Sequence, residues 1–287
     1  MNDLKISFEF FPPKNDEMEL ALETSAARLA SLDPHFVSVT YGAGGTTRGR
    51  SLSTVKSLLA RDAFPVAAHM TCVGATKAEV DEAVLEFAAA GVRHFVALRG
   101  DPPEGAAQFR PHPGGYRNGA DLVAGISALG DFEISVSAYP EKHPESLTLE
   151  VDLAMLAAKE ENGASRAITQ FFFDTSSYLR YVDRARARGI SMPIVPGILP
   201  ITNFARVCDF AKRCGTSIPK AFAARFEGLD QDPETRHLVA AMVAAEQVEA
   251  LRREGVNEFH FYTLNRADLA YALGRMLGAG APSAKAA

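Results

Sequence analysis

Near the start of the chain a single carboxylate stands among aromatic residues, in the run Ser7-Phe8-Glu9-Phe10-Phe11. The apolar residues alternate as in a strand, so Glu9 shares its face with Ser7 and Phe11. A carboxylate among aromatic side chains is costly to bury unless it has a partner or a chemical use. Such surroundings favour the protonated carboxyl, which is the form that a general acid needs near neutral pH. We therefore predict that Glu9 is a general acid.

Three further motifs have the composition of ligand-binding loops. Arg99-Gly100-Asp101 presents a cation and a carboxylate together, either for a ligand or as a simple ion pair at the end of a strand. Tyr41-Gly42-Ala43-Gly44-Gly45 lets backbone amides approach a ligand, although no Lys-Ser or Lys-Thr follows as in a P-loop. Gln170-Phe171-Phe172-Phe173 sets an amide beside a flat apolar surface that suits either an aromatic ring or the core. These motifs indicate a polar binding site but name no reaction.

Such residues need a scaffold, and the chain alternates short β-like runs with longer amphipathic stretches. A glycine that can take the left-handed backbone ends several helical stretches just before a strand, at Gly91, Gly163, Gly189 and Gly255. Strand, helix, glycine, strand is typical of βα units around a parallel sheet. Gly197-Ile198-Leu199-Pro200 resembles a turn. Eight strand runs predict an α/β fold, a (β/α)₈ TIM barrel: Ile6–Phe11, Phe36–Tyr41, Val66–Cys72, His94–Arg99, Phe132–Tyr139, Arg166–Phe172, Ile194–Pro196 and Glu258–Thr263.

The strands carry polar residues on one face, mostly near their carboxyl ends, where barrel active sites are built. Ile6, Phe8 and Phe10 should face the helices, which leaves Glu9 on the inner face. The isolated histidines His94 and His260 are more typical of a core or surface position than of a ligand site. The other residues expected on inner faces are Ser38, Thr40, His69, Thr71, Arg99, Asp101, Ser135, Ser137, Tyr139 and Gln170.

The composition and charge of the chain exclude several classes of protein. The 287 residues are 47% hydrophobic and 23% charged, with a net charge of −5, which argues against binding to nucleic acid or to anionic lipid. No apolar run approaches the roughly 20 residues that span a bilayer, and the N-terminus lacks the layout of a signal peptide. We expect a cytoplasmic protein with one catalytic domain over residues 1–277 and a flexible tail over 278–287.

Taken in order, eight motifs resemble those of the bacterial single-domain 5,10-methylenetetrahydrofolate reductase family, and they cover nearly the whole chain. The resemblance implies a barrel that binds FAD, takes a hydride from NADH or NADPH and passes it to 5,10-methylenetetrahydrofolate. The product, 5-methyltetrahydrofolate, is used in methionine synthesis. The matching segments are Ser7–Lys14, Ser38–Gly45, His69–Cys72, Ala97–Asp101, Ala138–Pro144, Ala167–Asp174, Pro196–Pro200 and Phe261–Arg266.

The resemblance also implies roles for individual residues. Glu9 matches the acid that protonates the pterin nitrogen, and Asp101 matches a carboxylate beside the flavin that also contacts folate. Gln170, Phe210 and Arg266 match substrate-binding positions. The positions that match FAD contacts are Thr40, Tyr41, Ala43, His69, Arg99, Gly100, Asp101, Tyr139, His143, Asp152 and Lys159.

Two positions depart from the family pattern, since Met155 and Ala158 stand where an Asn and an Arg are expected beside Lys159. Losing an Arg near a diphosphate removes a charge-assisted bond worth roughly 1.5–3 kcal/mol. Two alternatives therefore stay open beside the flavoenzyme: direct hydride transfer from the nicotinamide to folate, and a folate- or nucleotide-binding barrel without catalysis. No metal site is predicted. The resemblance suggests a homo-oligomer, and the sequence does not separate NADH from NADPH.

Overall fold

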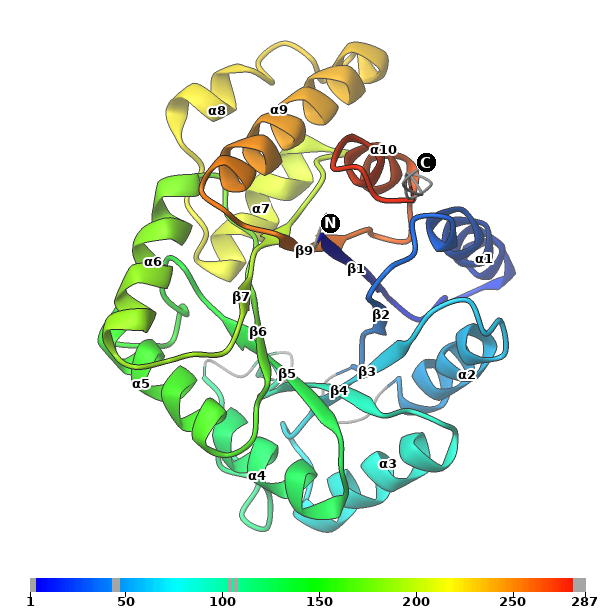
Figure 1. Ribbon diagram of the computed structural model, residues 1–287, viewed down its shortest axis with the longest axis vertical. Helices are drawn as coiled ribbons and strands as arrows, with labels where there is room; N and C mark the ends of the chain where they lie inside the picture. The colour runs from blue at the N-terminus through cyan, green and yellow to red at the C-terminus, as the bar shows by residue number, and fades with distance from the viewer. Residues whose placement is uncertain (1–3, 43–46, 103–104, 106–107, 281–287) are drawn as a thin grey trace, which may run out of the picture.

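The computed structural model describes residues 4–42, 47–102, 105 and 108–280, and these form a ring of parallel strands with helices on the outside (Figure 1). The hydrogen-bonded order of the strands is β7-β6-β5-β4-β3-β2-β1-β9-β8. The predicted (β/α)₈ barrel is confirmed. The strands are β1 Lys5–Phe10, β2 Phe36–Val39, β3 Val66–Thr71, β4 His94–Leu98, β5 Glu133–Ala138, β6 Arg166–Thr169, β7 Ile194–Val195, β8 Gly197–Ile198 and β9 Glu258–Tyr262.

The ring closes through a strand that Pro196 divides in two. Because proline has no backbone N–H, the ladder is interrupted there: β7 pairs with β6 and β8 pairs with β9. The prediction that Gly197 begins a turn is therefore wrong. A Cβ on Gly197 would lie 2.2 Å from the carbonyl oxygen of Thr169, so only glycine fits where the barrel closes. A two-residue strand is too short for its periodicity to be recognised in the sequence.

The helices between the strands begin with side-chain caps at most positions. At α3, Thr76 Oγ1 accepts from Glu79 N at 3.2 Å, and the Glu79 side chain accepts from Thr76 N at 2.8 Å, which together form a capping box. The helices are α1 Asp16–Ala30, α2 Arg48–Leu59, α3 Lys77–Ala89, α4 Gly119–Leu129, α5 Leu149–Glu161, α6 Thr175–Ala187, α7 Phe204–Cys214, α8 Lys220–Ala224, α9 Pro233–Arg253 and α10 Asp268–Met276.

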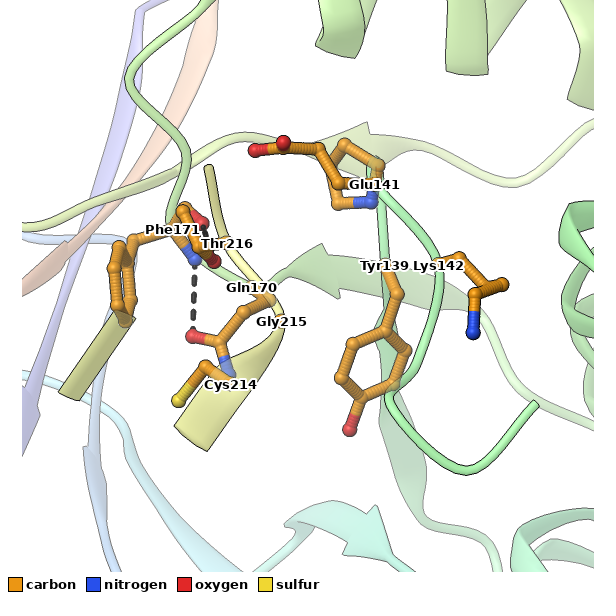
Figure 2. A pocket seen from close by; sticks show the side chains of 9 residues that line it. Tyr139, Glu141, Lys142, Gln170, Phe171, Cys214, Gly215 and Thr216 are labelled. Atoms are coloured by element: carbon orange, nitrogen blue, oxygen red, sulfur yellow. Dashed lines mark hydrogen bonds between the residues drawn. The ribbon is translucent and has the colours of Figure 1, made fainter. Parts of the chain in front are cut away.

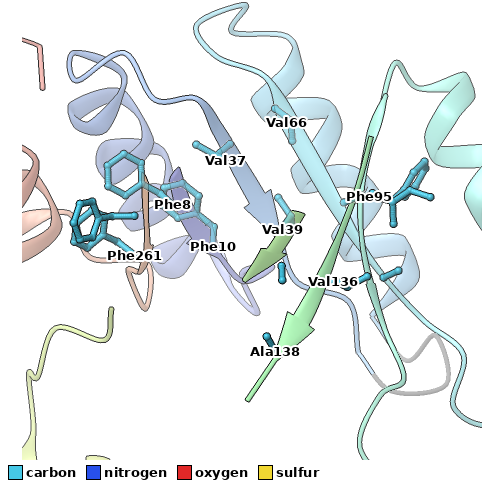
Figure 3. Close-up of a cluster of buried hydrophobic side chains, with 14 of the residues drawn as sticks. Phe8, Phe10, Val37, Val39, Val66, Phe95, Val136, Ala138 and Phe261 are labelled. Atoms are coloured by element: carbon cyan, nitrogen blue, oxygen red, sulfur yellow. The ribbon is translucent and has the colours of Figure 1, made fainter. Parts of the chain in front are cut away.

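Two apolar layers hold the barrel together. Phe8 and Phe10 are fully buried between β1 and the helices, in the cluster that Figure 3 shows. The second layer fills the inside of the barrel with Phe36, Ala67, Val96 and Ile168. The alternation predicted for β1 is confirmed, and it also means that Phe8 and Phe10 point away from the side chain of Glu9.

A charged network closes the amino end of the barrel. Arg166, the first residue of β6, is buried, and its guanidinium bonds Glu258 at 2.7 Å, His35 Nε2 at 2.9 Å and the Glu133 carboxylate. A buried arginine is tolerated when its donors are satisfied in this way. The network lies at the opposite end of the strands from the predicted site residues, so its role is structural.

In the described ranges, the loop after β4 and the C-terminal end of the chain both lack regular secondary structure, but they differ from each other. The described residues from 99 to 118, which follow β4, contain no helix or strand. At the C-terminal end, Ala279 is buried and its N–H donates to Gly274 O at 2.9 Å, so residues 278–280 pack on the barrel. The rest of the predicted tail, 281–287, lies outside the described residues. None of the helices in the described ranges has the length and apolarity that a bilayer span requires.

Candidate active site

A cavity of about 560 Å³ opens at the carboxyl ends of the strands. Arg266 is exposed and lies outside the part of the lining that the structure describes, and Ala43 lies outside the described residues. The other predicted site residues all line this one cavity: Glu9, Thr40, Tyr41, His69, Arg99, Gly100, Asp101, Tyr139, His143, Asp152, Lys159, Gln170 and Phe210. The folding of the barrel thus brings together residues that lie up to about two hundred positions apart in the sequence.

Glu9 faces two imidazoles on the inner side of the barrel. Its Oε2 lies 3.5 Å from His69 Nε2 and 3.9 Å from His260 Nε2. Burial lowers the pKa of His69 to about 4, although the charge of Glu9 opposes this, so His69 is neutral near pH 7. The prediction that aromatic side chains surround Glu9 is therefore wrong. Residues adjacent in a strand point to opposite faces, so Phe8 and Phe10 are neighbours of Glu9 in sequence but not in space.

A buried cation lies at the start of α4. Lys159 Nζ donates to Ser137 O at 2.7 Å, and burial lowers the pKa of its ammonium to about 8, with Asp152 opposing the shift. A Cβ on Gly119, the first residue of α4, would lie 3.1 Å from Lys159 Cε. The first N–H groups of a helix attract anions, and here Asn118 and Gly119 line the cavity. A phosphate-bearing ligand therefore finds an ammonium beside a helix N-terminus.

The loop after β5 is held by a carboxylate. Asp152 accepts from His143 N at 2.6 Å and from the Ser146 hydroxyl. The rings of His143 and Tyr139 meet edge to face, with centroids 4.7 Å apart. Burial raises the pKa of Tyr139 to about 12, so its hydroxyl keeps its proton near neutral pH. Asp152 thus positions two aromatic rings at the edge of the cavity.

The loop after β4 presents Arg99 and Asp101 separately. Arg99 pairs with Glu145 at 2.6 Å and lies over the Phe109 ring at 4.5 Å. The alternative of an ion pair between Arg99 and Asp101 is therefore not what the structure shows. Gly100 has a φ of +89°, and a Cβ there would lie 2.4 Å from Val73 Cγ1. A larger residue would displace the backbone that carries Asp101 to the cavity.

Gln170 and Phe171, which follow β6, line another part of the cavity. Figure 2 shows the Gln170 amide accepting from the Phe171 N–H, at 3.1 Å. Phe171 stacks on Phe210 of α7, with centroids 5.1 Å apart, whereas Phe172 stacks on Tyr178 and Phe173 packs on Phe222. The predicted flat apolar surface at the cavity therefore consists of Phe171 and Phe210, because Phe172 and Phe173 lie outside its described lining.

The far end of α7 is tied to both neighbouring loops. Thr216 Oγ1 donates to Phe171 O at 3.0 Å, and Ser217 N donates to Glu141 Oε2 at 3.1 Å. These bonds fix the helix that carries Phe210 relative to Tyr139 and Gln170, which Figure 2 shows around a small neighbouring cavity.

Several lining residues have no distinctive sequence signal. Thr71 Oγ1 is buried and has no hydrogen-bond partner among the described residues, so it is free to bond a ligand. Met155 lines the cavity, whereas Ala158, in the same helix, does not. Only the packing of α4 and β9 reveals Asn118, Gly119 and Tyr262 as lining residues.

Comparisons of the sequence with known proteins show which family the chain resembles. A family profile described as methylenetetrahydrofolate reductase matches residues 1–278. The chain is 48% identical over 275 residues to 5,10-methylenetetrahydrofolate reductase of Pectobacterium carotovorum subsp. carotovorum, covering 96% of this chain and 90% of that relative. The same enzyme of Escherichia coli K12 is also 48% identical over 275 residues, with 96% and 91% covered.

Solved structures share the fold at low identity. An uncharacterized protein from Clostridium thermocellum, which binds two copies of 5-methyl-5,6,7,8-tetrahydrofolic acid, superposes with a TM-score of 0.63 at 15% identity, covering 95% of this chain and 94% of that one. An oxaloacetate acetylhydrolase superposes with a TM-score of 0.55 at 14% identity, covering 96% and 81%. These likenesses concern the barrel alone.

Proposed function

Because this chain belongs to the methylenetetrahydrofolate reductase family, we propose that its cavity binds FAD, accepts reducing equivalents from NADH or NADPH, and reduces 5,10-methylenetetrahydrofolate to 5-methyltetrahydrofolate for methionine synthesis. The chain is an oxidoreductase that acts on a folate, and such a reaction needs a redox cofactor. No side chain in a protein of this composition stores a hydride, so the cavity must hold the group that does.

The residues present suit a ligand with anionic and aromatic parts. Lys159 and the N-terminus of α4 would hold the diphosphate, and the unpartnered Thr71 hydroxyl would bond a polar edge. Tyr139 and His143 offer aromatic contacts. When bound, FAD supplies a flavin ring that accepts and donates a hydride. The remaining positions that we propose as FAD contacts are Thr40, Tyr41, His69, Arg99, Gly100, Asp101 and Asp152.

On the folate side, the chain supplies a proton and an aromatic contact. Glu9 would donate its proton to the bridge nitrogen that lies outside the pterin ring. The bond from that nitrogen to the methylene carbon then breaks, which leaves an electrophilic iminium on the pterin nitrogen. Phe210, stacked on Phe171, would pack against the pterin, and the Gln170 amide would bond its edge. Asp101 reaches the same cavity from the β4 loop. Arg266 would have to turn inward from its exposed position to contact folate.

The observation that carries the proposal of a dinucleotide site is the buried Lys159 beside the α4 N-terminus, which suits the diphosphate that FAD and the nicotinamide cofactors share. Direct transfer from nicotinamide to folate remains the second candidate, and Met155 favours it, since an apolar thioether replaces an expected amide in the lining. Anaerobic assays with and without added FAD separate the two. Activity that rises with FAD, and visible flavin bands in the purified protein, support the first. Full activity in flavin-free protein, unchanged by FAD, supports the second.

A further inference from the structure

His260 is a buried titratable group with no assigned role. Its side chain is only 1% exposed, yet the residue lines the cavity, and its Nε2 lies 3.9 Å from Glu9 Oε2. Its other ring nitrogen, Nδ1, lies 2.8 Å from Ser7 Oγ on β1. The same hydroxyl lies 3.3 Å from Phe259 O. A line of polar atoms therefore runs from a backbone carbonyl through Ser7 and His260 to Glu9.

The contacts of Ser7 indicate which ring nitrogen of His260 carries the hydrogen. The Ser7 hydroxyl has one hydrogen to donate and lone pairs with which it accepts. Both of its contacts become hydrogen bonds only when Ser7 donates to Phe259 O and His260 Nδ1–H donates to Ser7. The opposite arrangement, with Ser7 donating to Nδ1, leaves the contact to Phe259 unused. In the neutral imidazole, His260 Nε2 is then without hydrogen and presents a lone pair to Glu9.

A bare Nε2 cannot bond a carboxylate, but it can accept from a protonated carboxyl that approaches closer than the present 3.9 Å. The other titratable groups that face Glu9 in the described part of the chain are His69 and Tyr262. The Tyr262 hydroxyl donates to Thr169 O at 2.7 Å, so it is engaged elsewhere. His69 Nε2 lies closer to Ser38 Oγ, at 3.1 Å, than to Glu9. The arrangement around His260 therefore favours the acid form of Glu9.

We infer that Ser7 and His260 are positioning residues that hold the proton on Glu9 between turnovers. The inference rests on the proposed role of Glu9. In each turnover the O–H bond of Glu9 breaks and its proton forms an N–H bond on the bridge nitrogen outside the pterin ring, as the bond from that nitrogen to the methylene carbon breaks. A proton from the solvent then returns to the carboxylate. His260 keeps its own proton on Nδ1 throughout, so it does not touch the substrate.

The test is the pH profile of the folate half-reaction, measured by stopped flow as the oxidation of reduced flavin by methylenetetrahydrofolate. His260→Leu removes the acceptor, and Ser7→Ala frees the imidazole to take the tautomer that donates to a carboxylate. Both changes should lower, by about one unit, the midpoint pH above which this half-reaction is lost. At a pH above the midpoint, the rate should then be about tenfold lower than that of the wild type. Flavin reduction by the nicotinamide should keep its rate and pH profile, which a general structural defect would not allow.

His94→Leu is the matched control. His94 is buried inside the same barrel and bonds Ser135 Oγ at 2.8 Å, but it lies outside the described cavity lining. Its replacement should leave the midpoint unchanged. If His260→Leu does not fold, Ser7→Ala alone carries the test, because it removes a single oxygen atom.

The outcomes separate this inference from the proposed function. If Glu9→Gln stops the folate half-reaction while Ser7→Ala and every folded His260 variant keep the wild-type midpoint, the inference is overturned and the role of Glu9 stands. If Glu9→Gln reduces folate at the wild-type rate, the proposed role of Glu9 is wrong, and the inference fails with it.

Discussion

Glu9 Oε2 lies 3.5 Å from Nε2 of His69, an imidazole that burial keeps neutral near pH 7. The carboxyl group thus lies beside an imidazole that carries no positive charge, and its side chain is 23% exposed. A carboxyl that is open to a ligand and not engaged in an ion pair is suited to donate a proton to it.

Glu9→Gln should therefore lower folate reduction by about 10²–10⁴-fold, the usual contribution of a general acid. The amide keeps the shape of the side chain but has no acidic proton. Flavin reduction by NADH or NADPH needs no such proton and should stay within about twofold. The two half-reactions measured separately by stopped flow provide the check, and equal losses in both would contradict the assignment.

Asp101→Asn should raise the midpoint potential of bound flavin by tens of millivolts, where about 30 mV corresponds to 1.4 kcal/mol for a two-electron couple. A carboxylate at the cavity disfavours the anionic reduced flavin, and the amide removes that charge. The folate half-reaction should slow, because a better electron acceptor is a poorer hydride donor. Spectroelectrochemical titration measures the potential, and an unchanged value would place Asp101 away from the flavin.

Lys159→Met should weaken FAD binding by roughly 10–100-fold, as expected for the loss of one buried charge-assisted bond. Lys56→Met, at an exposed position on α2, is the control and should bind FAD as the wild type does. Equilibrium dialysis gives both dissociation constants. Since burial lowers the pKa of Lys159 to about 8, affinity for FAD should also fall as the pH rises above about 8. Equal affinities for Lys159→Met and wild type would contradict the diphosphate site.

The stability of the fold should decrease in mild acid. Burial lowers the pKa of both His69 and His94 to about 4, against about 6.5 in an unfolded chain. Between about pH 6.5 and 4 the unfolded chain therefore binds protons that the folded chain does not. The free energy of unfolding should fall as the pH falls, by up to about 1.4 kcal/mol per pH unit for each histidine.

Urea denaturation at pH 7, 6 and 5 checks this. His94→Asn removes one of the two groups, so its stability should fall less steeply with decreasing pH than that of the wild type. Identical slopes for the two proteins would show that His94 does not contribute.

The sequence predicted the barrel well because its signals are local. Alternation along β1, the capping box at Thr76 and the glycines after helices each report on a few consecutive residues. The first half of the strand that Pro196 divides lies within the predicted run Ile194–Pro196, but Gly197–Ile198 escaped recognition because two residues carry no periodicity. The prediction of aromatic surroundings for Glu9 failed for a related reason, since the imidazoles of His69 and His260 reach it from other strands. Packing between elements, not spacing along the chain, sets such contacts.

The central claim is that one cavity carries hydride from a nicotinamide to folate through FAD, and the most direct measurement is an anaerobic titration of the purified protein followed by its visible spectrum. We predict that NADH or NADPH bleaches the flavin absorbance, and that methylenetetrahydrofolate then restores it while 5-methyltetrahydrofolate forms in equal amount. Stoichiometric folate reduction by protein that contains no flavin, with no change when FAD is added, would contradict the claim.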